Sequence, residues 1–118
     1  QLCCDWDFYF NQLLNDPEKV KEIINSMQEK KILQKQKPDS QEIEGHIAKA
    51  EHNLRFISET KPEFNDWVMT GCYYACYHAA LALILSKGYS SKNHLATLCI
   101  LIKDFYKKEL DKEDLELY

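Results

Sequence analysis

The chain has 118 residues, of which 45% are hydrophobic and 29% are charged, with only three Gly and three Pro. This length and composition fit one ordinary helical domain and exclude a collagen-like or low-complexity chain. The formal charge of −4 excludes strong attraction of the whole surface to nucleic acid, although a local basic patch stays compatible with it.

The first half of the chain predicts three helices. An aromatic-rich segment, residues 5–15, forms the first. The second begins at Asp16-Pro17, because Asp is a favoured N-cap and Pro suits the first helical position, and it fades into the lysine-rich residues 29–37. The third begins at Asp39 and ends at Pro62. Its apolar side chains step by four and three residues, which predicts a stripe that packs on another helix: Ile43, Ile47, Ala50, Leu54 and Ile57.

The second half predicts one long helix and two further ones. The long helix covers residues 63–87, and Gly88 provides a left-handed C-cap. Ser90 or Ser91 caps the next helix, which reaches Phe105, and another helix starts at Asp111. Short connections between such helices favour an up-and-down arrangement. The sequence therefore predicts an all-α protein, a bundle of four to five helices in residues 39–118 with an extra N-terminal helical pair in residues 1–38, together one compact domain.

Cysteine content and hydropathy indicate the setting of the protein. An odd number of cysteines without a preceding secretory signal favours a reduced, cytoplasmic setting. The longest apolar run, Ala79–Leu85, is shorter than the roughly 20 residues that span a membrane, so no membrane association is expected. The chain begins with Gln and stops in a helical pattern at Tyr118, so we expect both ends to be truncated.

Several linked motifs resemble the HEPN family, the higher eukaryotes and prokaryotes nucleotide-binding domain. They are Ile47-Ala-Lys-Ala-Glu-His-Asn-Leu54, Asp66-Trp67, Cys72-Tyr-Tyr-Ala-Cys-Tyr-His-Ala-Ala80, Ser86-Lys-Gly88 and Ser91-Lys-Asn-His94. The resemblance covers residues 43–105. It implies a bundle of four or five helices, homodimerisation and a site along a helical groove. HEPN proteins are metal-independent ribonucleases, often toxins paired with a small nucleotidyltransferase, or non-catalytic nucleotide- or RNA-binding modules.

The ribonuclease motif of that family, Arg-x(4–6)-His, is absent from the sequence. Arg55 is the sole arginine, and no His follows it at that spacing. Lys87 and His94 imitate the spacing with Lys in place of Arg. The leading hypothesis is therefore a nucleotide- or RNA-binding module, and the resemblance suggests that its partner is a nucleotidyltransferase in a toxin–antitoxin pair. The alternatives are a metal-independent endoribonuclease, with His94 as acid/base and the arginine supplied by a segment beyond Tyr118, and a purely structural interaction bundle.

Two sets of residues are candidates for ligand binding. A helix start attracts anions, so Ser91, Lys92 and His94 are expected to hold a phosphate, with Lys87 nearby. On the long helix, Tyr73, Tyr74, Tyr77 and His78 are expected to line a groove where a base stacks, with Asn53 and Asp66 as further polar groups. The competing interpretation makes Tyr74, His78 and Leu81 a core-facing stripe.

The remaining cysteines and histidines predict no metal site or cofactor. Cys72 and Cys76 share a helical face, but Cys99 has no paired spacing, so these three are expected to be small core residues. Cys3 and Cys4 form no second pair with other cysteines. His46 and His52 lie six residues apart on the third helix, which predicts that both are on a solvated face.

Overall fold

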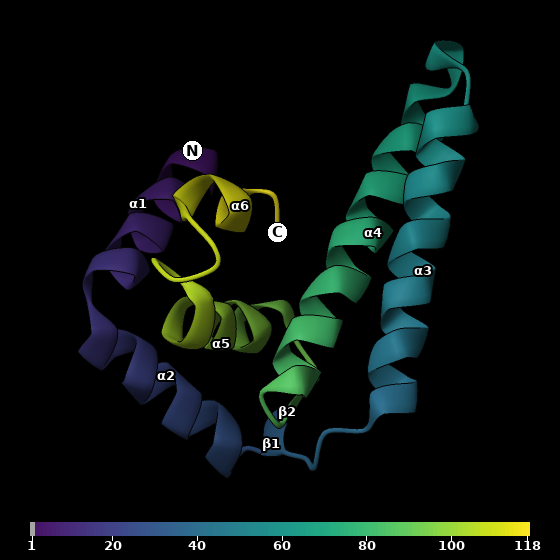
Figure 1. Ribbon diagram of the computed structural model, residues 1–118. Coiled ribbons are helices and arrows are strands. Elements are labelled where there is room, and N and C mark those ends of the chain that lie inside the picture. Colours follow the sequence, from purple (N-terminus) through teal and green to yellow (C-terminus); the bar gives the residue numbers. More distant parts are fainter. Residues whose placement is uncertain (1) are drawn as a thin grey trace. The chain divides into compact units, whose positions relative to one another are not determined.

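The computed structural model describes residues 2–118, with side chains from Trp6 onward. It confirms the all-α class, since six α-helices make up most of the described chain (Figure 1). The helices are α1 (Leu2–Asn15), α2 (Pro17–Glu29), α3 (Ser40–Glu59), α4 (Asn65–Ser86), α5 (His94–Phe105) and α6 (Lys112–Glu116), and a short 3-10 helix, η1 (Pro62–Phe64), precedes α4.

Two predicted N-caps and one predicted glycine turn explain three of the helix boundaries. The Asp16 carboxylate accepts a hydrogen bond from the Lys19 backbone N–H, and the Asp39 carboxylate accepts one from Gln41 N–H at 2.9 Å. Both bonds satisfy amides that have no partner within the helix. Gly88 has φ +86°, the left-handed conformation predicted for the end of the long helix.

The chain forms two compact units, and it passes from one to the other near residues 34, 90 and 115. One unit combines residues 1–34 with 91–115, and the other contains residues 35–90 and the last three residues. The predicted boundary at residue 38 lies close to the first crossing, whereas α5 groups with α1 and α2.

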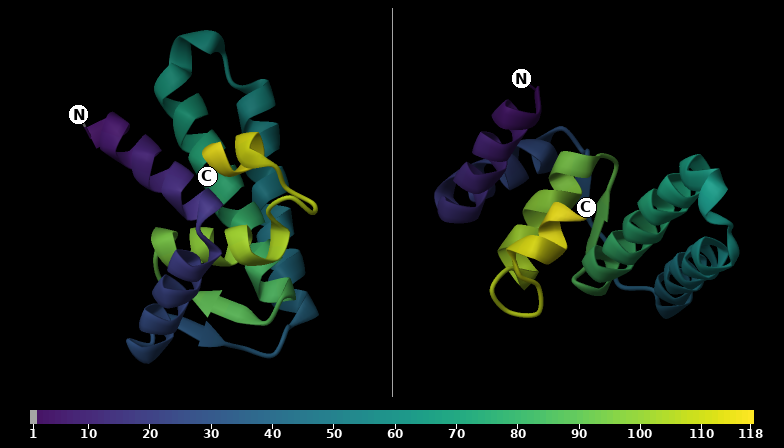
Figure 2. Two further views of the ribbon diagram at one scale, coloured as in Figure 1. Left: turned by 90° about the vertical axis from the view of Figure 1, so that its left-hand side faces the viewer. Right: turned by 90° about the horizontal axis from the view of Figure 1, so that it is seen from above.

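Two short strands, β1 (Leu33–Lys35) and β2 (Tyr89–Ser91), form a small sheet that the helical patterns did not predict (Figure 2). The backbone N–H of Lys92 donates to the Ile32 carbonyl at 2.9 Å, and that of Gln36 donates to the Gly88 carbonyl at 2.8 Å. This pairing order makes the strands antiparallel.

The first unit has a core of large apolar side chains. Helix α5 is buried along most of its length, and α2 packs against it. The buried side chains come from four helices and β1: Phe10, Leu13, Leu14, Val20, Ile24, Leu33, Leu98, Ile100, Leu101, Phe105 and Leu115. Burial of such side chains is the main source of stability for this unit.

The second unit is built on α3 and α4, which lie side by side and antiparallel (Figure 1). Small residues stand at their contact: Ala50, Gly71 and Ala75 are all buried. At Gly71 an added Cβ would lie only 2.9 Å from Cγ1 of Ile57, so the two helices approach closely there. Small residues permit this short separation.

The packed face of α3 differs from the predicted apolar stripe. Ile47 and Leu54 are exposed, at 43% and 57%, whereas His46 and Asn53 are half-buried. The less exposed side chains of α3 are therefore those of Ile43, His46, Ala50, Asn53 and Ile57. The prediction was wrong for Ile47 and Leu54 because close contact with α4 selects the small residue Ala50 and its helical neighbours rather than the most apolar face.

Candidate functional site

The predicted site residues divide between the two units. Ser91, Lys92 and His94 belong to the first unit, and Asn53, Asp66, Tyr74, Tyr77, His78 and Lys87 belong to the second. Each group is therefore described within its own unit.

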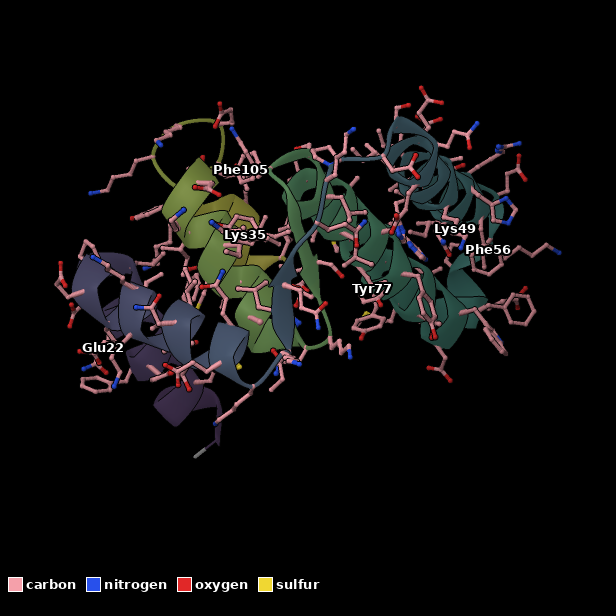
Figure 3. All side chains as sticks on the ribbon, turned by 90° about the horizontal axis from the view of Figure 1, so that it is seen from below. Glu22, Lys35, Lys49, Phe56, Tyr77 and Phe105 are labelled. Carbon is pink, nitrogen blue, oxygen red and sulfur yellow. The ribbon has the colours of Figure 1, made fainter. Side chains whose placement is uncertain are left out.

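Three tyrosines of α4 form an exposed aromatic cluster, which we call the tyrosine face: Tyr73, Tyr74 and Tyr77. Their exposed fractions are 58%, 46% and 38%. The rings of Tyr73 and Tyr77 are nearly parallel, at 15° with centroids 6.3 Å apart, and Tyr73 meets Tyr74 edge-on at 5.3 Å. Figure 3 shows Tyr77 on α4 and Lys49 on the neighbouring α3. The competing core interpretation is wrong for Tyr74, because this side chain is exposed, whereas Leu81 is half-buried.

His78 joins the tyrosine face to α3. Its ring lies 5.1 Å from that of Tyr77 and 6.5 Å from that of Tyr74. On its other side, Nδ1 of His78 lies 2.9 Å from Nδ1 of His46. The structure thus places His46 at the site, where it is half-buried, so the prediction of a solvated face was wrong for His46. His52, for which the same was predicted, is exposed. The missed signal was helical spacing, because His46 stands four residues before the buried Ala50.

The surroundings of His78 favour its neutral form. Burial lowers the pKa of His78 below the ordinary value of 6.5, and the nearby His46 and Lys49 lower it further. Desolvation disfavours a charged imidazole, and a second positive group repels the added proton. Near neutral pH the ring is therefore a hydrogen-bonding group without charge.

The start of α5 is capped by Asn93 rather than by Ser90 or Ser91. The Asn93 side-chain oxygen accepts a hydrogen bond from the Ala96 N–H at 2.8 Å. The Ser91 hydroxyl instead donates to the Asn93 carbonyl at 2.9 Å, which fixes the turn before the helix. The prediction of a serine cap was wrong because the extended backbone of β2 continues to Ser91, so the helix begins later.

His94 is the first residue of α5, and it is exposed together with Lys92. Loss of part of its hydration lowers the pKa of His94 below 6.5. Its imidazole is therefore mainly neutral near pH 7, the form that accepts a proton from a hydroxyl.

The other predicted polar residues occupy separate positions. The Asn53 side-chain amide donates to the Lys49 carbonyl at 2.9 Å, so one of its donors serves its own helix. Asp66 is exposed in the first turn of α4, and Lys87 is exposed just after its last residue.

The cysteines fall into different environments. Cys99 is fully buried in α5, and burial raises its pKa to about 11. Cys72 is exposed and Cys76 is half-buried, so the prediction of a core role was wrong for Cys72, which lies on the solvent side of α4. Cys3 and Cys4 lie outside the described side chains. Among the residues whose side chains are described, no three His, Cys, Asp or Glu form a group that could hold a metal ion.

The stretch Pro62–Ser86 is, by length and composition, apolar enough to cross a membrane, and 33% of its most apolar window is buried. Core helices of soluble proteins also meet this criterion, so it does not identify a membrane protein.

The chain was compared with models of known protein families, with curated proteins and with solved structures, and none of them matched.

Proposed function

We propose that the protein is a nucleotide- or RNA-binding helical module and that the tyrosine face supplies its base-binding surface. The observation that carries the proposal is the exposed, mutually ordered set of Tyr73, Tyr74 and Tyr77 beside the half-buried His78. The resemblance of residues 43–105 to HEPN domains motivates the same function.

The tyrosine rings have the properties of a stacking surface. Aromatic side chains bind nucleic-acid bases face to face, and each such contact contributes about 1–3 kcal/mol. The contacts among Tyr73, Tyr74 and Tyr77 restrict their rings before a ligand arrives. A restricted surface loses less conformational entropy on binding than a mobile one.

The charges favour a small or single-stranded ligand. Lys49 lies on α3 close enough to His78 to influence its charge, and it offers a cation for one phosphate. The formal charge of −4 opposes the broad phosphate contacts that duplex nucleic acid requires. The best ligand class is therefore a free nucleotide or a short single strand.

Fluorescence anisotropy with a labelled single-stranded RNA, and calorimetry with ATP and GTP, test the proposal. Tyr73→Ala should weaken binding by roughly 5- to 150-fold, the equivalent of about 1–3 kcal/mol. Phe8→Ala is the control, because Phe8 is an exposed aromatic residue of α1 in the other unit. Equal affinity of wild-type protein, Tyr73→Ala and Tyr77→Ala would exclude the tyrosine face as the binding surface.

A second candidate, a metal-independent endoribonuclease, is favoured by His94 alone. Its lowered pKa suits a general base that takes a proton from a ribose hydroxyl. Cleavage of an RNA pool in EDTA by the wild-type protein, lost in His94→Ala, would support it. Absence of cleavage by the wild-type protein would leave the binding module.

A third candidate is an interaction module that forms homodimers or binds a nucleotidyltransferase. Its specific support is a group of exposed apolar side chains in η1 and at the start of α4: Phe64, Trp67 and Met69. Light scattering on wild-type protein and on Trp67→Ser tests self-association: a dimer that dissociates in the variant supports it, and a monomer at high micromolar concentration contradicts it.

A further inference from the structure

His46 and His78 face each other head-on across the contact between α3 and α4. Their Nδ1 atoms are 2.9 Å apart, their ring centroids are 5.2 Å apart and their planes differ by 27°. The centroid separation exceeds the nitrogen separation by about the sum of the two ring radii. The two nitrogens therefore lie on the line between the ring centres, and each nitrogen points at the other.

Only one proton fits between the two nitrogens. A neutral imidazole has one N–H donor and one bare nitrogen, so one ring must carry its proton on Nδ1 and the other on Nε2. A first added proton can bind at a remote Nε2, which leaves an N–H···N hydrogen bond between the rings. A second added proton makes both rings charged, and each Nδ1 then carries a hydrogen that points at the other.

This geometry suits a proton better than a metal ion. Two ligands of one metal aim their lone pairs at a common point beside the line that joins them, whereas these lone pairs point along that line. The described side chains also supply no third ligand.

We propose that the His46–His78 pair is an acid-sensitive latch between α3 and α4, closed while at least one ring is neutral and opened when both rings are protonated. The two histidines come from α3 and α4, the helices that make the main contact of their unit. Loss of this bond therefore weakens the packing of α3 against α4. The inference does not depend on what the tyrosine face binds.

The groups around the pair set its sensitivity to acid. From α3, Lys49 adds a positive charge, and Glu42, one turn before His46, is a carboxylate that accepts a hydrogen bond from Gln36 at 3.1 Å. Lys49 disfavours protonation of His78, and the Glu42 carboxylate is the acidic group of α3 one turn away from His46. From α4, the rings of Tyr74 and Tyr77 contact His78, so opening of the latch also disturbs the tyrosine face.

The sign of the pH effect follows from the lowered pKa of His78. Below pH 6.5 the unfolded chain binds a proton on this residue more readily than the folded chain does. Stability therefore rises with pH in this window. The contribution of the latch is complete above pH 6.5 and is lost as the pH falls through the lower pKa of the folded state.

Urea unfolding, followed by circular dichroism between pH 7.5 and pH 5, tests the latch. Each proton that the unfolded chain binds in excess raises the unfolding equilibrium constant by up to about tenfold per pH unit. His78→Gln should remove this part of the pH dependence. His52→Gln is the control, because His52 is an exposed histidine of α3, the helix that also carries His46, and it should keep the wild-type dependence. Equal pH dependence in the wild type and in His78→Gln would overturn the proposal.

A second measurement uses the wild-type protein alone and so does not depend on folding of a variant. Nitrogen-detected NMR of the histidine rings should show opposite tautomers for His46 and His78 above pH 7. On acidification the two rings should titrate as a coupled pair, and the amide signals of α3 and α4 should shift with them. Identical tautomers with independent titration would show that no latch exists.

Discussion

Substitution of Gly71 by Ala tests how closely α3 and α4 approach. Gly71 is buried in α4, and a Cβ at this position would lie 2.9 Å from Cγ1 of Ile57 and 3.1 Å from Cδ2 of Phe56. Phe56 is 40% exposed and can move aside. Cγ1 of Ile57 is close to its backbone, however, so relief there requires a shift of α3 or an altered Ile57 rotamer.

Two effects of the substitution oppose each other. Ala in place of Gly inside a helix stabilises by roughly 0.5–1 kcal/mol because the unfolded chain loses freedom. Insertion of a methyl group into a packed contact costs typically about 1–3 kcal/mol. We expect the clash to win, with a net loss of about 1 kcal/mol for Gly71→Ala. Gly45 of α3 has nothing within 4 Å of its added Cβ, so Gly45→Ala should stabilise by about 0.5–1 kcal/mol.

Urea denaturation measures the free energy of unfolding of both variants. Gly71→Ala should lower it and Gly45→Ala should raise it, so the two variants should differ by about 1.5–2 kcal/mol. In a double-mutant cycle, Ile57→Ala should relieve the clash and give a coupling energy above about 0.5 kcal/mol with Gly71→Ala. Stabilisation by Gly71→Ala as large as that by Gly45→Ala would refute the close approach of the two helices.

Two further predictions concern the cap of α5 and the exposure of the cysteines. Asn93→Ala should destabilise the protein by about 1 kcal/mol, because it removes the hydrogen bond to the Ala96 N–H that caps α5. Thermal unfolding would detect this loss, and an unchanged unfolding midpoint would show that Asn93 does not stabilise the start of α5. At pH 8 a thiol reagent should label the exposed Cys72 rapidly, whereas Cys99, buried and with its pKa raised to about 11, should react only in denaturant. Mass spectrometry of the labelled peptides would identify each site, and rapid labelling of Cys99 in the folded protein would contradict its burial.

The candidate site was only partly predictable. Tyr73, Tyr74 and Tyr77 stand out because they recur on one helix among small residues, and the structure leaves all three exposed. His46 was missed because the more apolar Ile47 beside it gave the stronger signal. Helical periodicity in the sequence indicates that a helix such as α3 has a buried face. Which of two adjacent residues lies on that face depends on the side chains of the partner helix and on its distance.

Local signals were enough for the starts of α2 and α3 and for the end of α4. Asp16, Asp39 and Gly88 act through bonds and backbone angles within about one turn, so their roles follow from the chain itself. The choice of partners depended on tertiary structure. Three contacts join segments that are more than thirty residues apart in the sequence. They are the packing of α5 on α2, the pairing of Leu33–Lys35 with Tyr89–Ser91, and the contact of His46 with His78. Such contacts depend on the shapes of two surfaces together, and neither sequence segment carries that information alone.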